Sequence, residues 1–311
     1  MSPPARRSTP RISWWSLSNP PLFAGFETHD INVPGAVIHA RVGGAGEPLL
    51  LLHGYPQTGA MWHEAAQVFA KTYRVVVADL RGYGASQALD GDYTFRAMAR
   101  DQVALMAALG FERFHVISHD RGARTAHRMT LDHPDAVASV ALIDILPTLD
   151  VWRTMDDWLA KRYWHWPFLA QPGGMPERMI NADPVAFLHE ALLGLAGSAD
   201  FFDPRAMRAY EDAASNPAVV AAWCGDYAAG ASIDLEHDSA NLGETRQMPC
   251  LVLWGKTGAV AHHVDPLEVW QAWFPQAQGA AIDAGHFMVE EQLEATMAPL
   301  LAHLARRGSA T

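Results

Sequence analysis

The stretch HVISHDRGART, residues 115–125, contains a turn with an acid at its centre. The run FHVIS (114–118) that leads into it is short, apolar and rich in β-branched residues, which predicts a strand. The turn Ser118-His119-Asp120-Arg121-Gly122 places small residues two positions on either side of Asp120, and the following residues favour a helix. Turns of this pattern present a nucleophile between a strand and a helix. We therefore predict that Asp120 lies at the tip of a strand.

The same strand-like pattern recurs along the chain. Short apolar runs bounded by turn residues occur at 36–42, 48–54, 73–79, 114–118, 139–144, 249–255 and 279–283. Runs that are apolar throughout are typical of parallel strands covered on both faces. Helical patterns alternate with them, as at 95–110, which ends on Gly110 as a helix C-terminus should. The alternation predicts an α/β fold with a mostly parallel central sheet flanked by helices.

This rhythm is interrupted between about Pro147 and Leu242, a stretch rich in Trp, Met, Phe and Ala that has no strand-like run. We predict a helical cap at 147–242, inserted over the carboxyl ends of the strands of a core formed by 25–146 and 243–311. Ligands of open α/β sheets bind outside those strand ends. Residues 1–24 are rich in Pro, Ser and Arg, which predicts a flexible tail.

Composition restricts the function classes. The 311-residue chain has a net charge of −11, which argues against a nucleic-acid partner and means that an anionic substrate needs local cations. No run approaches the ~18 apolar residues that cross a membrane, so we expect no membrane association and a cytoplasmic location. Cys224 and Cys250 are expected to be buried free thiols.

Four motifs follow predicted strands in order: HGYPQT (53–58), DLRGYGAS (79–86), SHDRGAR (118–124) and AGHF (284–287). With the capped core, they resemble the α/β-hydrolase superfamily from about residue 30 onward. In this superfamily the turn usually reads G-x-S-x-G, so Ser118 stands in place of the first glycine and Asp120 in place of the serine nucleophile.

An aspartate nucleophile predicts the class of reaction. A serine that attacked a saturated carbon would leave an ether, whereas a carboxylate leaves an ester that water can cleave. Asp120 therefore suits dehalogenation or epoxide opening. The alternative is that Asp120 merely caps the following helix.

His286 is the expected base that activates the hydrolytic water. Its orienting acid usually follows the strand that ends in LWG (253–255), but that loop carries no carboxylate before Asp265. We assign Asp144, at the end of the run 139–144, with Asp265 as the less favoured choice. Asp144 could instead cap the first helix of the cap. The backbone N–H groups of Tyr55 and Arg121 are expected to hold the oxyanion.

Two arginines follow the nucleophile. Arg121 and Arg124 share a helix face, and two cations at a positive helix N-terminus are locally unfavourable unless an anion lies between them. A guanidinium matches a carboxylate, so we expect the pair to bind a substrate carboxylate. The alternative is that they pair with carboxylates of the core.

The cap offers His165, Trp166 and Tyr227, whose N–H and O–H groups suit a departing halide. Each alone could equally be a core residue. Together, SHDRGAR, DILPT, YWHW, GDYAAG and AGHF resemble the fluoroacetate (haloacetate) dehalogenases. The resemblance implies the triad Asp120, His286 and Asp144, carboxylate binding by Arg121 and Arg124, halide binding by His165, Trp166 and Tyr227, a homodimer, and no cofactor or metal.

The sequence thus predicts hydrolytic dehalogenation of a short 2-haloacid, haloacetate first. One alternative is an epoxide hydrolase with the same triad, in which Tyr163 and Tyr227 would protonate the opening alkoxide. Another is an inactive hydrolase-fold protein that binds a small molecule. Halogen and chain-length preference stay open.

Overall fold

A single sheet forms the centre of the molecule in the computed structural model, which describes residues 21–262 and 264–306. The main path of the sheet has the order β1-β2-β4-β3-β6-β7-β8-β9, and β5 pairs with β2. The strands are β1 (Glu27–Val33), β2 (Ala36–Gly44), β3 (Glu47–Leu52), β4 (Tyr73–Ala78), β5 (Gln87–Ala88), β6 (Phe114–His119), β7 (Val137–Ile143), β8 (Cys250–Gly255) and β9 (Gln278–Ile282).

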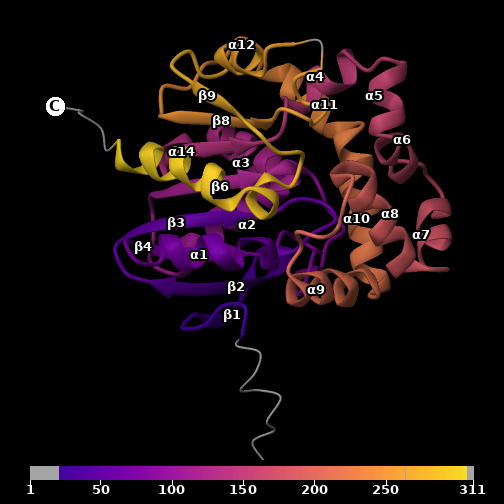
Figure 1. The fold of residues 1–311 in the computed structure, drawn as a ribbon, viewed down its shortest axis with the longest axis horizontal. Helices are drawn as coiled ribbons and strands as arrows, with labels where there is room; N and C mark the ends of the chain where they lie inside the picture. The colour runs from indigo at the N-terminus through magenta and orange to yellow at the C-terminus, as the bar shows by residue number, and fades with distance from the viewer. Residues whose placement is uncertain (1–20, 263, 307–311) are drawn as a thin grey trace, which may run out of the picture.

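The six strands from β4 through β3 and β6 to β9 pair in parallel, so their carboxyl ends lie along one edge. The helices that accompany the sheet are η2 (Gly59–Trp62), α1 (His63–Phe69), α2 (Phe95–Ala108), α3 (Asp120–Asp132), η3 (Pro134–Ala136), α12 (Pro266–Gln271), α13 (Met288–Glu291) and α14 (Leu293–Ala305). The predicted fold, a mostly parallel sheet flanked by helices, is confirmed (Figure 1).

One edge of the sheet differs from the prediction. β2 was expected among the parallel strands, but it runs antiparallel to both β1 and β4. Buried and partly exposed residues alternate along most of β2, which is the pattern of an antiparallel strand near an edge. β1 was missed because its alternation is weak and most of its residues are exposed or half-buried.

Between β7 and β8 the described chain is helical. The helices are α4 (Thr148–Arg153), α5 (Asp157–Arg162), α6 (His165–Leu169), α7 (Met175–Ile180), α8 (Pro184–Ala196), α9 (Pro204–Ala214), α10 (Pro217–Gly230) and α11 (Ile233–Ala240). They gather on one side of the sheet (Figure 1), and we call them the cap. The boundaries at 147 and 242 remain a prediction, and residues 1–20 of the predicted tail lie outside the described residues.

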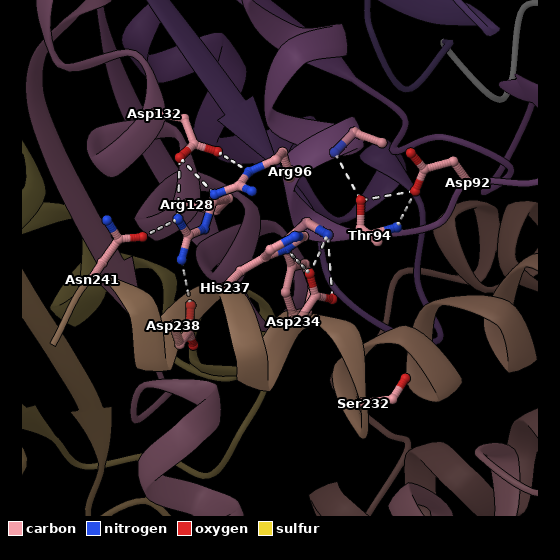
Figure 2. A network of polar contacts seen from close by, with 12 residues as sticks. Asp92, Thr94, Arg96, Arg128, Asp132, Ser232, Asp234, His237, Asp238 and Asn241 are labelled. Atoms are coloured by element: carbon pink, nitrogen blue, oxygen red, sulfur yellow. Dashed lines mark hydrogen bonds and ion pairs between the residues drawn. The ribbon is translucent and has the colours of Figure 1, made fainter.

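The last cap helix, α11, is fastened to the core by a polar network (Figure 2). Arg128, on the core helix α3, donates to Asp238 of α11 at 2.8 Å and to Asn241 at 2.7 Å. It also donates to Asp132 at 3.1 Å, which in turn accepts from Arg96 of α2 at 2.8 Å. These charge-assisted bonds join the end of the cap to two core helices.

Every helix within residues 21–262 and 264–306 is too short or too polar to span a membrane. Cys224 and Cys250 are both buried and unpaired, as expected.

Candidate active site

The turn after β6 has the strained geometry of a nucleophile-bearing loop. Asp120 has φ of +45°, in the left-handed region that costs a non-glycine residue about 1 kcal/mol or more. Two glycines allow the chain to approach it. A Cβ on Gly54 would lie 2.4 Å from the Cβ of Asp120, and one on Gly122 would lie 2.4 Å from the carbonyl oxygen of His53. Close contact with the loop after β3 therefore requires glycine at position 122, on one side of Asp120, and at position 54, on the loop itself.

The carboxylate of Asp120 is buried yet ionised. One oxygen, Oδ1, accepts a hydrogen bond of 2.8 Å from the backbone N–H of Tyr55, one of the two predicted oxyanion donors. Burial alone would raise the pKa of Asp120, but His286, His119 and the two following arginines together lower that pKa to about 2. Asp120 is thus a carboxylate near neutral pH and needs no base to become a nucleophile.

His286 and Asp144 form a buried pair. His286 Nδ1 lies 2.6 Å from Asp144 Oδ2, and the other oxygen of Asp144 accepts from the backbone N–H of Gly255 at 2.8 Å. Burial favours neutral His286, but the hydrogen bond to Asp144 and the charge of that carboxylate raise the pKa of His286 above its usual value. This pair fixes the Nδ1–H tautomer and leaves Nε2 to accept a proton.

Two alternatives were open for these residues: Asp265 as the orienting acid, and Asp144 as a helix cap. Asp265 is exposed and accepts from the backbone N–H of Leu267 at the start of α12, ten residues beyond the end of β8. The first cap helix, α4, follows Pro147 and has no side-chain cap, so Asp144 does not cap it. Among the residues with φ above zero that are not glycine, the described chain has only Asp120 and Asp144.

A small chamber lies at the carboxyl ends of the strands, under the cap. Its volume is about 10 Å³, close to the least that holds one water molecule. Core and cap both contribute to its wall, which is formed by Tyr55, Asp120, Arg124, Tyr163, His165, Trp166, Leu195, Tyr227 and His286. The structure therefore brings the predicted nucleophile, base and three halide-site residues together around one space.

The three predicted halide-site residues lie on the cap. His165 and Trp166 begin α6, and Tyr227 lies on α10. All three are buried, and the described residues show no side-chain hydrogen bond for any of them. Burial lowers the pKa of His165 to about 3 and raises that of Tyr227 well above its usual value, so both are neutral and carry a proton to donate.

The two arginines lie in different surroundings. Arg121 donates through Nε to Asp226 Oδ2 at 2.8 Å and through Nη2 to both Asp226 Oδ1 and the Asp226 backbone oxygen. Arg121 thus pairs with a carboxylate of the protein, but this carboxylate belongs to the cap and not to the core, as the alternative had expected. Its role toward a substrate stays a prediction, and its Nη1 atom is buried without a partner.

Arg124 lines the chamber. Its Nη1 donates to the Leu146 backbone oxygen at 2.8 Å and to Thr148 Oγ1 at 3.1 Å, and its guanidinium lies 4.6 Å from the ring centroid of Trp166. The Nε atom is buried without a partner. Within the described residues no carboxylate lies at salt-bridge distance from Arg124, so its charge is available to a ligand.

Three residues of this region were not singled out from the sequence. Asp226 and Tyr83, whose hydroxyl donates to Asp226 at 2.6 Å, complete the surroundings of Arg121, and Leu195 closes one side of the chamber. Asp226 had a signal that could have been used, since it is the only charged residue of the otherwise apolar and small-residue helix α10. A carboxylate in such a helix needs a buried cation.

Comparison with known proteins identifies the fold and the family of this chain. Residues 47–293 match the family model described as alpha/beta hydrolase fold. The chain is 45% identical to a fluoroacetate dehalogenase from Burkholderia sp over 86% of this chain and 90% of the relative. It is 28% identical to a soluble epoxide hydrolase from Corynebacterium sp. over 85% of this chain and 92% of the relative.

Among solved structures, a Pseudomonas aeruginosa protein provisionally described as an epoxide hydrolase is 44% identical, with a TM-score of 0.89 over 93% of this chain and 98% of that one. A Nostoc sp protein provisionally described as an alpha/beta hydrolase is 42% identical, with a TM-score of 0.88 over 90% and 98%. By the family model and by the extent of its identity to the Burkholderia protein, this chain belongs to the α/β hydrolases and, within them, to the family of the fluoroacetate dehalogenase.

Proposed function

We propose that the protein is a hydrolytic dehalogenase of short 2-haloacids, with haloacetate as the preferred substrate. The observation that carries the proposal is the wall of the chamber. An ionised aspartate faces three cap donors that make no side-chain hydrogen bond within the described residues, and one arginine, Arg124, that has no salt-bridge partner among them. A carboxylate on the substrate needs the cation, and a departing halide needs the neutral donors.

The first step is a displacement at carbon. The Oδ2 atom of Asp120 attacks the halogen-bearing carbon, a carbon–oxygen bond forms, and the carbon–halogen bond breaks with both electrons leaving on the halide. His165, Trp166 and Tyr227 donate to the halide as its charge develops. Arg124, with the free Nη1 of Arg121, holds the substrate carboxylate so that the three reacting atoms are in line.

The second step hydrolyses the ester. His286 Nε2 takes a proton from water, and the hydroxide attacks the carboxyl carbon of Asp120. Oδ1, which already accepts from the Tyr55 N–H, becomes the oxyanion, with the Arg121 N–H as the second donor. The bond between that carbon and the ester oxygen then breaks, and glycolate leaves with the proton from His286.

The size of the chamber favours a small acid. At about 10 Å³ it holds no more than one water, so its wall must move to admit any substrate, and a small acid needs the least movement. Fluorine is the smallest halogen, and three donors suit fluoride, which is a poor leaving group. Fluoroacetate is therefore within the proposed substrate class. Homodimer formation and a cytoplasmic location remain predictions.

A panel of acids tests the proposal. Halide release is measured with fluoro-, chloro- and bromoacetate and with 2-chloropropionate, and the Asp120→Asn enzyme gives the background. In a single turnover in water labelled with heavy oxygen, the label should enter Asp120 and not the glycolate. Label found directly in glycolate would contradict the covalent mechanism.

Epoxide hydrolysis is the second candidate, and one observation favours it. Tyr163 and Tyr227 both line the chamber, and burial raises the pKa of both phenols, so both could protonate an alkoxide. Diol formation from styrene oxide without halide release from chloroacetate would select this candidate. If the protein catalyses neither reaction, the remaining alternative is an inactive protein that binds a small molecule. In that case chloroacetate would leave no added mass on Asp120 in the His286→Asn variant.

A further inference from the structure

Asp226 is a fully buried carboxylate that belongs to the cap. It lies on α10, one residue before Tyr227, and its side chain accepts from Nε and Nη2 of Arg121 and from the hydroxyl of Tyr83. Its backbone oxygen accepts a further bond from Arg121 at 2.9 Å. A buried carboxylate is tolerated only when it is paired and hydrogen-bonded in this way.

The pair restricts what Arg121 can offer a ligand. Both members have no exposed side-chain area, and the charge of one cancels that of the other at this contact. Two of the three guanidinium nitrogens of Arg121 are engaged by Asp226, and Nη1 alone is left without a partner. Arg121 thus has one free nitrogen but no net charge to offer.

Arg124 is the opposite case. Its hydrogen-bond partners, the Leu146 carbonyl and the Thr148 hydroxyl, are neutral, and the first charge that acts on it is the Asp120 carboxylate, with which no salt bridge is formed within the described residues. In a buried site a charge that is not held in an ion pair acts over several ångströms with little screening. The two neighbouring arginines on α3 are therefore unequal.

We propose that Asp226 is a positioning residue, which locks Arg121 into a neutral pair with a single free donor and leaves Arg124 as the cation that selects an anionic substrate. This inference rests on the proposed function. The same contact fixes the neighbouring Tyr227, because the guanidinium of Arg121 lies 4.2 Å from the centroid of its ring. Through Arg121, Asp226 thus connects the residues that are proposed to bind the substrate carboxylate with Tyr227, which is proposed to bind the halide.

The test compares the removal of one charge with the removal of a neutral pair. The two enzymes are Arg124→Gln and the double variant Arg121→Gln with Asp226→Asn. For each, kcat/KM is measured for chloroacetate and for its neutral counterpart chloroacetamide, with Asp120→Asn as background. We expect Arg124→Gln to lower the ratio of the two constants about a hundredfold, while the double variant keeps it within about fivefold. Equal losses in both enzymes would overturn the proposal.

A matched control lies two turns away on the same helix. The double variant Arg128→Gln with Asp238→Asn removes the other pair between α3 and the cap, and it should leave both the ratio and kcat unchanged. If this control also changed the ratio, the effect at Asp226 would be one of cap attachment, and the proposal would fail.

Binding of acetate keeps the test independent of turnover. Calorimetry should show that acetate affinity falls far less in the Arg121, Asp226 double variant, which loses one hydrogen bond to the carboxylate, than in Arg124→Gln, and the reverse order would refute the inference. A wild-type enzyme that releases no halide but shows this order would contradict the proposed function alone.

If the double variant does not fold, Tyr83→Phe removes one bond to Asp226 without changing any charge. We expect a lower kcat, by about tenfold, at an unchanged ratio of chloroacetate to chloroacetamide. An unchanged kcat would show that Asp226 does not position Tyr227.

Discussion

Two arginines of helix α3, Arg121 and Arg128, each bind an aspartate of the cap. They lie seven residues apart, hence two turns along nearly the same face of the helix. Arg121 meets Asp226 of α10, and Arg128 meets Asp238 of α11. The chemistry of the two contacts is the same, and their surroundings are different.

The pair near Asp120 is closed to water and surrounded by aromatic rings, with Arg121 4.2 Å from the ring centroid of Tyr227 and 4.5 Å from that of Phe95. The distal pair is part of a wider network in which Arg128 also binds Asn241 and the partly exposed Asp132 (Figure 2). The same kind of ion pair thus has two roles. The Arg128–Asp238 pair attaches the cap away from the chamber, and the Arg121–Asp226 pair orders the side chains beside the chamber.

The largest effect is expected at the start of α3. Asp120→Asn should lower halide release from chloroacetate at least about ten-thousandfold, because an amide is not a nucleophile for saturated carbon. Asparagine tolerates the left-handed backbone that Asp120 adopts, so the melting temperature should stay near that of the wild type. A variant that stays active would refute the assignment of the nucleophile.

A smaller loss, about a thousandfold at neutral pH, is expected for Asp144→Asn. His286 must be neutral to accept a proton, and its pKa is raised by Asp144, so wild-type kcat should fall as the pH drops through a value above 6.5. In Asp144→Asn, which lacks this carboxylate, the fall of kcat on the acidic side of the pH profile (the acid limb) should occur at lower pH. The measurement is kcat as a function of pH, and an unmoved limb would contradict the pairing of these two residues.

The distal contact should affect stability and leave the chemistry intact. Asp238→Asn removes one carboxylate from Arg128, which keeps Asp132 and Asn241 as partners, so we expect a loss of about 2 kcal/mol in the free energy of unfolding. Denaturant titration gives that value, and kcat/KM for chloroacetate should stay within about twofold. A large kinetic effect would show that the two ends of α3 do not have separate roles.

The smallest effect concerns the choice of substrate. Tyr163 lines both the chamber and a neighbouring, mainly apolar cavity of about 160 Å³ that includes Leu146, Val151 and Leu159. Tyr163→Ala should connect the two spaces and raise kcat/KM for 2-chlorobutyrate relative to chloroacetate about tenfold. Tyr163→Phe is the control, since it keeps the ring, and an increase there would mean that the wall is not what limits size.

The sequence predicted the fold because its signals are local. Short apolar runs marked every parallel strand, and the small residues around Asp120 marked the turn, since both follow from backbone geometry and close contact. The edge was harder to predict. β1 carries few buried residues, and the direction of β2 depends on which strand it pairs with, which is a property of the tertiary structure.

The site was predictable to the extent that its residues sit at strand ends. Asp120, Asp144 and His286 each follow a strand, and the chamber gathers the cap residues His165, Trp166 and Tyr227. The partner of Arg121 was not predictable, because Asp226 is 105 positions further along the chain and meets it only when the cap folds over the core. Sequence spacing predicts neighbours on one helix, but it does not predict a contact between domains.

The two contacts of α3 also restrict how such an enzyme can be redesigned. A cap taken from another hydrolase would have to present two carboxylates twelve positions apart, as Asp226 and Asp238 are, to meet both arginines. A transplanted cap with only the carboxylate that meets Arg128 would still dock, but it would enclose the unpaired guanidinium of Arg121 beside Asp120. More of these chimeras should therefore fold than are active. In a chimera that folds but is inactive, the first change to try is an aspartate at the position equivalent to Asp226.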